Sequence, residues 1–159
     1  MNNYLLTEEI VFDSKPEAVP YNYRISYKMA QICLIISKSC KGRAGCSLIK
    51  LHIISNALNT QEYMNDLQNY VNGKIGYIIV RFDPVVNRAI KYAIADNLIE
   101  QLKNGTFKLT ENGKKLIKKV EKEDIMAREK KFLDELGSKL SNEKVERLMS
   151  LWRYKNAEN

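Results

Sequence analysis

The chain of 159 residues is poor in the residues that most catalytic and metal sites need. It contains one histidine, His52, and three cysteines without CxxC spacing, Cys33, Cys40 and Cys46. A single histidine excludes multi-histidine metal sites and argues against Ser-His-Asp or Cys-His catalysis. We expect His52 to be a hydrogen-bonded structural residue. The unpaired cysteine spacing argues against a disulfide framework or a zinc site, so we expect buried free thiols.

Long apolar runs and catalytic motifs are also absent. No stretch approaches the roughly 20 apolar residues that span a bilayer. The opening residues, MNNYLLTEEIVFD, are acidic where a signal peptide has a basic start and an apolar core, so we expect a cytoplasmic protein. The chain lacks HExxH, a nucleophile elbow and a phosphate-binding glycine loop. We therefore expect that the protein is not an enzyme and that it binds no metal ion and no cofactor.

The net charge of +7 is concentrated in one part of the chain. Residues 41–120 hold 13 basic and six acidic side chains, whereas residues 1–40 and 121–159 carry equal numbers of each. A basic excess permits contact with a polyanion. A polyanionic partner is therefore expected to contact residues 41–120 and not the two ends of the chain.

A helix is predicted from Pro84 onward. Asp83 is a suitable N-cap, and proline is favoured at the first helical position. Apolar residues then recur at three- and four-residue spacing and predict one buried face: Val86, Ala89, Ile90, Ala93 and Ile94. Asn87, Arg88 and Lys91 lie on another face.

A hairpin and a further helix follow. Two short apolar runs, 98–102 and 106–109, flank Lys103-Asn104-Gly105, and Asn-Gly between such runs is a strong hairpin signal. Thr110 is the predicted cap of the next helix, although Gly113 stands where a capping box has Glu or Gln. Leu116, Ile117 and Val120 give that helix its buried side. Helix, hairpin and helix together indicate a winged helix.

The residues before this unit predict an arm, three helices and a strand. Pro16 and Pro20 favour an extended N-terminal arm over residues 1–22, with a winged-helix core over 23–120. Periodic apolar residues predict helices over 23–39, 47–58 and 61–71, with a tight turn at 41–45. The run 74–82 is rich in Ile, Tyr, Val and Phe and predicts a strand.

The remaining residues, 121–159, predict one or two amphipathic helices. Their apolar stripe either folds back on the core or docks another protein. The candidate partner-binding residues are Phe132, Leu136, Leu148, Leu151 and Trp152. The predicted fold class is therefore mainly α with a small β-sheet, a winged helix-turn-helix core carrying an N-terminal arm and C-terminal helices.

Three stretches suggest a family. CSLIKLHIISNALNT, FDPVVNRAIKYAIADNLIE and NGTFKLTENGKKLIKKV resemble the small middle components of bacterial ABC-three-component defence systems, including the middle subunit of Lamassu-type antiphage complexes. The resemblance spans residues 24–120. It implies a non-catalytic bridge with a winged-helix core, whose partners are an SMC-like ATPase subunit and an effector subunit.

The sequence is compatible with two functions. The first is such a bridging subunit, which also contacts double-stranded DNA; the second is a winged-helix transcriptional regulator whose C-terminal helices form a homodimer. A winged helix places one helix in the major groove and lets the wing touch the backbone. The candidate nucleic-acid-binding residues are Arg81, Asn87, Arg88, Lys91, Lys103 and Lys108.

Overall fold

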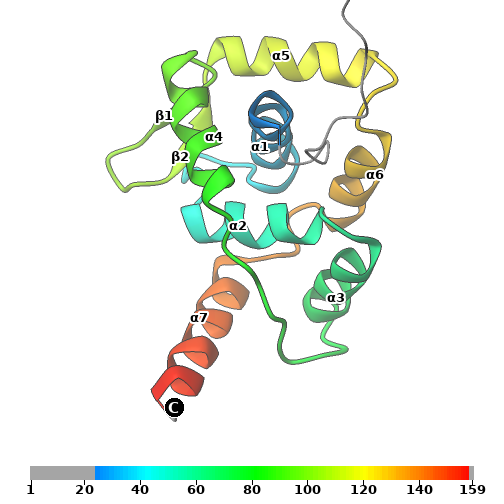
Figure 1. Cartoon of the computed structure of the whole chain (residues 1–159), viewed down its shortest axis with the longest axis vertical. Coiled ribbons are helices and arrows are strands. Elements are labelled where there is room, and N and C mark those ends of the chain that lie inside the picture. The colour runs from blue at the N-terminus through cyan, green and yellow to red at the C-terminus, as the bar shows by residue number, and fades with distance from the viewer. Residues whose placement is uncertain (1–23, 158–159) are drawn as a thin grey trace, which may run out of the picture.

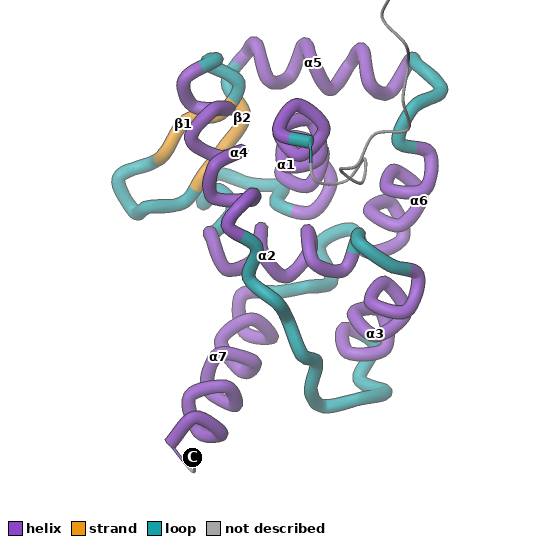
Figure 2. The backbone as a smooth tube through the Cα atoms, in the orientation of Figure 1, coloured by secondary structure: helices purple, strands orange, loops and turns teal. Residues whose placement is uncertain are grey.

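The computed structural model describes residues 24–157, and these fold mainly into helices, with a small antiparallel sheet at one side (Figures 1 and 2). The elements in order are α1 (Ile25–Ser39), α2 (Leu48–Ala57), α3 (Gln61–Val71), α4 (Pro84–Ala95), β1 (Ile99–Gln101), β2 (Phe107–Leu109), α5 (Glu111–Lys122), α6 (Ala127–Leu136) and α7 (Asn142–Ala157). None of the helices in residues 24–157 is long and apolar enough to cross a bilayer. The predicted arm, 1–22, lies outside the described residues.

Helix α1 lies at the centre of the fold. Figure 1 shows it nearly end-on, with α2, α4, α5 and α6 arranged around it. Ile32, Leu34 and Ile35 are fully buried although they point to different sides of the helix. A helix that is apolar around most of its circumference is buried on all sides, as the widened apolar face of this segment predicted.

The predicted caps of α2 and α3 are confirmed. The side chain of Ser47 accepts a hydrogen bond from the Lys50 N–H, and the side chain of Thr60 accepts one from the Tyr63 N–H. Each bond satisfies a backbone donor that the first turn of a helix leaves without a partner. Helix α2 lies beneath α1 in Figure 1 and contacts α3, which lies below α6.

The predicted strand over 74–82 is wrong. This stretch runs as a loop from α3 to α4, and no strand pairs with it in the part of the chain that the structure describes (Figure 2). A preference for β structure is largely a preference for packing against a neighbouring strand. Here β1 and β2 pair with each other and β2 also bridges Cys46, so neither strand pairs with residues 74–82.

The helix and hairpin predicted from residue 83 onward are confirmed. Asp83 caps α4 by accepting a hydrogen bond from the Val85 N–H at 2.9 Å, and Pro84 opens the helix. Strands β1 and β2 are antiparallel, with Glu100 opposite Lys108. Their turn contains Gly105 at φ +85°, a backbone conformation that glycine adopts without strain.

Gly113 shows why the capping box is incomplete. Thr110 caps α5 as predicted and accepts a hydrogen bond from the Gly113 N–H at 3.1 Å. A Cβ atom on residue 113 would lie 2.1 Å from the carbonyl oxygen of Leu98. Glutamate or glutamine at this position is therefore excluded by the close approach of the chain that enters β1.

The cysteines differ from the prediction in part. Cys33 is a buried free thiol, as expected, and burial raises its pKa to about 12. Cys40 and Cys46 form a disulfide that closes the turn between α1 and α2, which corrects the expectation of three free thiols. The six-residue spacing of Cys40 and Cys46 matches no short cysteine motif, so it did not predict the disulfide. The fold of the turn brings the two side chains together.

The C-terminal helices fold back on the core. Leu133, Leu136 and Leu148 are fully buried, and the Tyr70 hydroxyl donates a hydrogen bond to the Lys144 carbonyl at 2.6 Å. Helix α6 packs against α1, while α7 extends away from the other helices toward the C-terminus (Figure 1).

The close approach at Gly113 predicts a large effect of a single methyl group. We expect Gly113→Ala to lower the free energy of unfolding by about 1–3 kcal/mol, because the added Cβ must displace the backbone at Leu98. Gly76→Ala is the matched control, since its Cβ meets nothing within 4 Å, and it should stay within about 0.5 kcal/mol. Urea unfolding of both variants measures the difference, and equal stabilities would contradict this packing.

Candidate nucleic-acid interface

Helix α4 divides sharply into a buried and an exposed face. The residues of α4 that pack inward are Val86, Ala89, Ile90 and Ala93, and Asn87, Arg88 and Lys91 are exposed, as the sequence predicted. Ile94, which was predicted on the buried face, is instead 40% exposed, because it lies in the last turn at the edge of that face. Residues three and four positions apart are neighbours on a helix surface, so the side chains of Asn87, Arg88 and Lys91 share one patch. Tyr92, four residues after Arg88, adds an aromatic ring that is 54% exposed. Sequence reasoning did not include Tyr92, although its four-residue spacing from Arg88 places it on the exposed face.

The side chain of Asn87 is hydrogen-bonded to His52, the only histidine of the sequence. The Nε2 atom of His52 lies 3.0 Å from Asn87 Oδ1, and His52 is 4% exposed. An amide oxygen only accepts, so Nε2 donates this bond and the Asn87 amide nitrogen stays free to donate outward. The bond to His52 fixes the orientation of the Asn87 amide and uses one of the two lone pairs of its oxygen. His52 has the hydrogen-bonded structural role that the sequence predicted.

The hairpin carries the two other lysines of the predicted site. Lys103 is exposed in the turn between β1 and β2. Lys108 is exposed on β2, where its Nζ lies 3.3 Å from a carboxylate oxygen of Glu100 on the opposite strand. The charge of Lys108 is thus partly balanced within the hairpin, and Lys103 is the freer cation.

The turn between α1 and α2 lies directly beside the hairpin, which the sequence did not predict. Cys46 and Phe107 exchange two backbone hydrogen bonds of 2.7 and 2.8 Å. The Ala44 carbonyl accepts bonds from the Thr106 hydroxyl at 2.6 Å and from the Asn104 amide at 3.3 Å. These contacts span about 60 residues of sequence, so no local pattern reports them.

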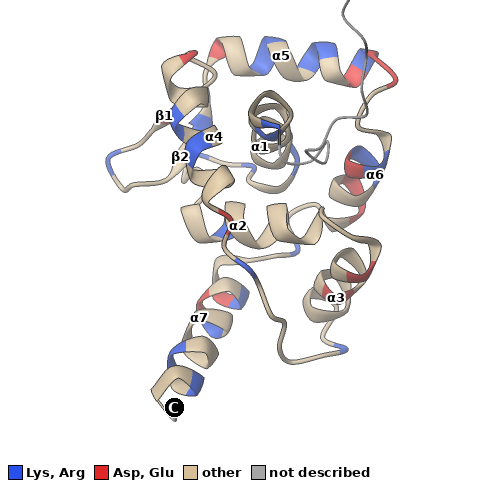
Figure 3. Ribbon diagram, in the orientation of Figure 1, with Lys and Arg blue, Asp and Glu red and all other residues tan. Residues whose placement is uncertain are grey.

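Two further cations join the hairpin through this contact. Lys41 and Arg43 are exposed on the turn, on either side of Gly42. Gly45, at φ +74°, allows the turn to touch Thr106, because a Cβ there would lie 2.4 Å from its hydroxyl. The turn and the hairpin therefore form one basic edge. Figure 3 shows basic residues on α4, β2 and the hairpin turn, acidic residues on α3, and residues of both signs on α5 and α6.

Arg81 lies apart from this edge. It precedes the first turn of α4, whereas the hairpin follows the last turn, and α4 is about 18 Å long at 1.5 Å per residue. Its backbone N–H donates to Asn56 Oδ1 at 3.2 Å, beside a groove that it shares with α3. Arg81, a candidate nucleic-acid-binding residue, therefore lies at the other end of α4 from Lys103 and Lys108.

The predicted partner-binding residues divide into two groups. Phe132, Leu136 and Leu148 are buried within the chain's own core and are not exposed at its surface. Leu151 and Trp152 are partly buried on α7. The Trp152 indole donates a hydrogen bond to the Ile78 carbonyl at 3.3 Å, and its ring contacts Phe82 edge-on.

A buried polar cluster lies at the start of α1. The ammonium group of Lys28, which is fully buried, donates to Gln31 Oε1 at 3.1 Å and to Ser55 Oγ at 3.0 Å. Burial lowers the pKa of Lys28, and the carboxylates of Asp83 and Glu129 oppose that shift. Sequence reasoning missed this cluster, because a lysine in a helix normally lies in water.

The burial of Lys28 predicts a pH dependence. Its folded pKa lies below 10.5, so the unfolded chain binds more protons, and stability rises with pH between the folded pKa and 10.5. We expect Lys28→Met to remove this gain, measured by urea unfolding at several alkaline pH values. Lys139→Met, at an exposed position, is the control and should keep it. An unchanged pH profile in Lys28→Met would contradict the buried charge.

No family model, curated protein or solved structure matches this chain.

Proposed function

We propose that this chain is a winged-helix accessory subunit without catalytic activity, which joins an SMC-like ATPase to an effector and contributes a basic surface for double-stranded DNA. The order of elements supports the winged-helix interpretation. Helix α4 leads into the β1–β2 hairpin, and the Cys46–Phe107 bridge adds a third backbone segment beside β2. In this proposal α4 enters the groove and the hairpin is the wing.

The observation that carries the DNA contact is the shared basic edge. Arg88 and Lys91 project from α4, Lys103 lies in the hairpin turn, and the disulfide-closed turn adds Lys41 and Arg43. Backbone amides and lysines that track a phosphate backbone bind without sequence preference. A bridging subunit needs to stay bound to DNA of any sequence, and it does not need to recognise particular bases.

The chain departs from a simple helix-turn-helix. In a simple helix-turn-helix motif, a turn of about three or four residues joins the first helix to the recognition helix. Here α3 and the loop 72–83 separate α2 from α4. Phe132, Leu136 and Leu148 pack inside the chain, so these three residues serve neither as a dimer interface of the regulator nor as a docking surface of the bridge.

Charge reversal on α4 tests the DNA contact. We expect the double variant Arg88→Glu and Lys91→Glu to reduce duplex binding at least about tenfold at low salt, and to lower the slope of log affinity against log salt by about 1–2. Lys131→Glu, exposed on α6, is the control with unchanged folding and binding. Equal binding by the double variant would remove α4 from the interface.

Co-purification tests the bridging role. The tagged full chain, isolated from its native host with bound proteins identified by mass spectrometry, is expected to recover a coiled-coil ATPase and a second large protein. Recovery of a homodimer alone would contradict the bridge. A preference of about 1,000-fold for one DNA sequence would then support the regulator.

A further inference from the structure

The loop between α3 and α4 has the features of a strand without a neighbour. The backbone N–H groups of residues 76–80 donate no hydrogen bond within residues 24–157. Neighbouring side chains alternate, since Ile78 is 8% exposed and Ile79 is 74% exposed. Alternation of this kind is typical of an extended chain that covers a core with one face. Free backbone donors along such a chain are a template for pairing.

Two hydrogen bonds define the edges of this segment. The Ile78 carbonyl accepts from Trp152 on α7, and the Arg81 N–H donates to Asn56 at the end of α2. In an extended chain, the polar groups of successive residues point to opposite edges. Tyr77 and Ile79 therefore share the edge of Arg81, and Asn56, which accepts the Arg81 bond, lines a groove together with residues of α3.

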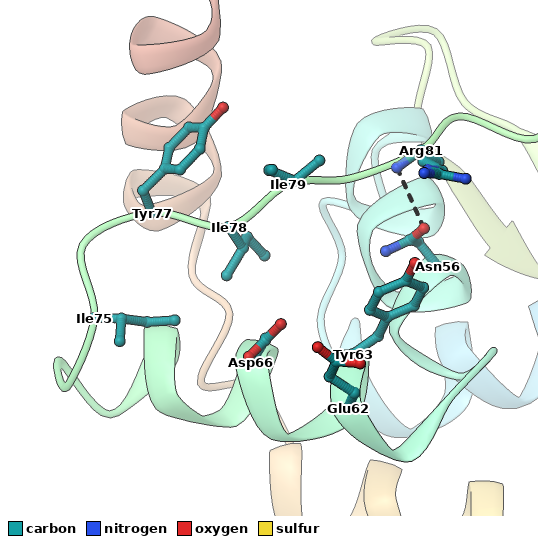
Figure 4. A pocket seen from close by; sticks show the side chains of 9 residues that line it. All are labelled: Asn56, Glu62, Tyr63, Asp66, Ile75, Tyr77, Ile78, Ile79 and Arg81. Carbon is teal, nitrogen blue, oxygen red and sulfur yellow. Dashed lines mark hydrogen bonds between the residues drawn. The ribbon is translucent and has the colours of Figure 1, made fainter.

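A groove lies along that edge (Figure 4). Its volume is about 400 Å³, and α3 lines it with Glu62, Tyr63 and Asp66. In Figure 4 the Tyr63 and Asp66 side chains extend from α3 toward the loop. The structure gives Glu62 and Asp66 no ion pair within the described residues. We call this the α3 groove.

We propose that the α3 groove binds an extended segment of a partner protein, which adds as a strand to residues 76–80 and places a lysine or arginine against Glu62 and Asp66. Backbone pairing supplies affinity, and the carboxylates select the charge of the partner. The inference does not depend on the ATPase or DNA contacts proposed above.

A synthetic peptide tests the site on the full chain. The probe has nine residues, alternates valine with threonine and carries lysine at two threonine positions; the control peptide has glutamate there. We expect the lysine peptide to shift the amide signals of Tyr77 and Ile79 saturably in NMR spectra, and the glutamate peptide to bind about tenfold more weakly. Absence of saturable shifts, or shifts confined to other helices, would overturn the proposal.

Two variants separate the contributions. Ile79→Pro removes the central donor without breaking a hydrogen bond of the chain, and should weaken binding about tenfold. Ile79→Thr keeps the donor and should bind within about threefold of the original. Thermal unfolding confirms that both fold. Equal binding by Ile79→Pro and Ile79→Thr would exclude strand addition.

Charge exchange tests the carboxylates. We expect Asp66→Lys to weaken the lysine peptide and to strengthen the glutamate peptide, each by about threefold to tenfold. Asn65→Lys, at the neighbouring exposed position of α3, is the matched control for added charge. If both variants act alike, recognition by Asp66 is excluded.

Discussion

The burial of α1 is the constraint on which the other helices depend. A helix that is apolar on most of its circumference must be enclosed, and α2, α4, α5, α6 and the hairpin each cover part of it. Helix α2 is itself buried at every position from Lys50 to Ala57, whereas α4, α5 and α6 each have one inner face and one exposed face. For α4 this fixes Ala89 and Ile90 inward and leaves Arg88 and Lys91 in solvent. The basic surface is thus a consequence of how the core is closed.

The second constraint is the attachment of the α1–α2 turn to the hairpin. Two backbone bonds join Cys46 to Phe107, which is itself buried, and the Cys40–Cys46 disulfide ties the same turn to the end of α1. A two-stranded hairpin alone is marginally stable in water. Here it packs on the central helix and gains a third backbone segment, so its lysines are presented by a supported surface.

Local chemistry explains why the region after residue 82 was predictable from the sequence. Asp83-Pro84, Asn104-Gly105 and Thr110 determine caps and turns through neighbours a few residues away, and the structure uses all of them. The candidate cations on α4 and the hairpin followed from those elements. The exposure of Arg88 could be predicted from the helical spacing of the apolar residues alone.

Contacts distant in sequence explain what was missed. The run 74–82 has strand-forming residues but no partner, and nothing within it reports that absence. Lys41 and Arg43 reach the hairpin through bonds to residues 104–107. Lys28 is buried because Gln31, Ser55 and the surrounding helices enclose it. Each of these depends on packing that only the folded chain defines.

The central claim is that α4, the hairpin turn and the α1–α2 turn form one surface for duplex DNA. Hydrogen exchange with and without a duplex of arbitrary sequence tests it most directly. The account predicts slower exchange at α4, at residues 103–105 and at residues 41–45 together, with α3 and α7 unchanged. Protection on α3 or α7 alone, or no protection at any segment, would contradict it.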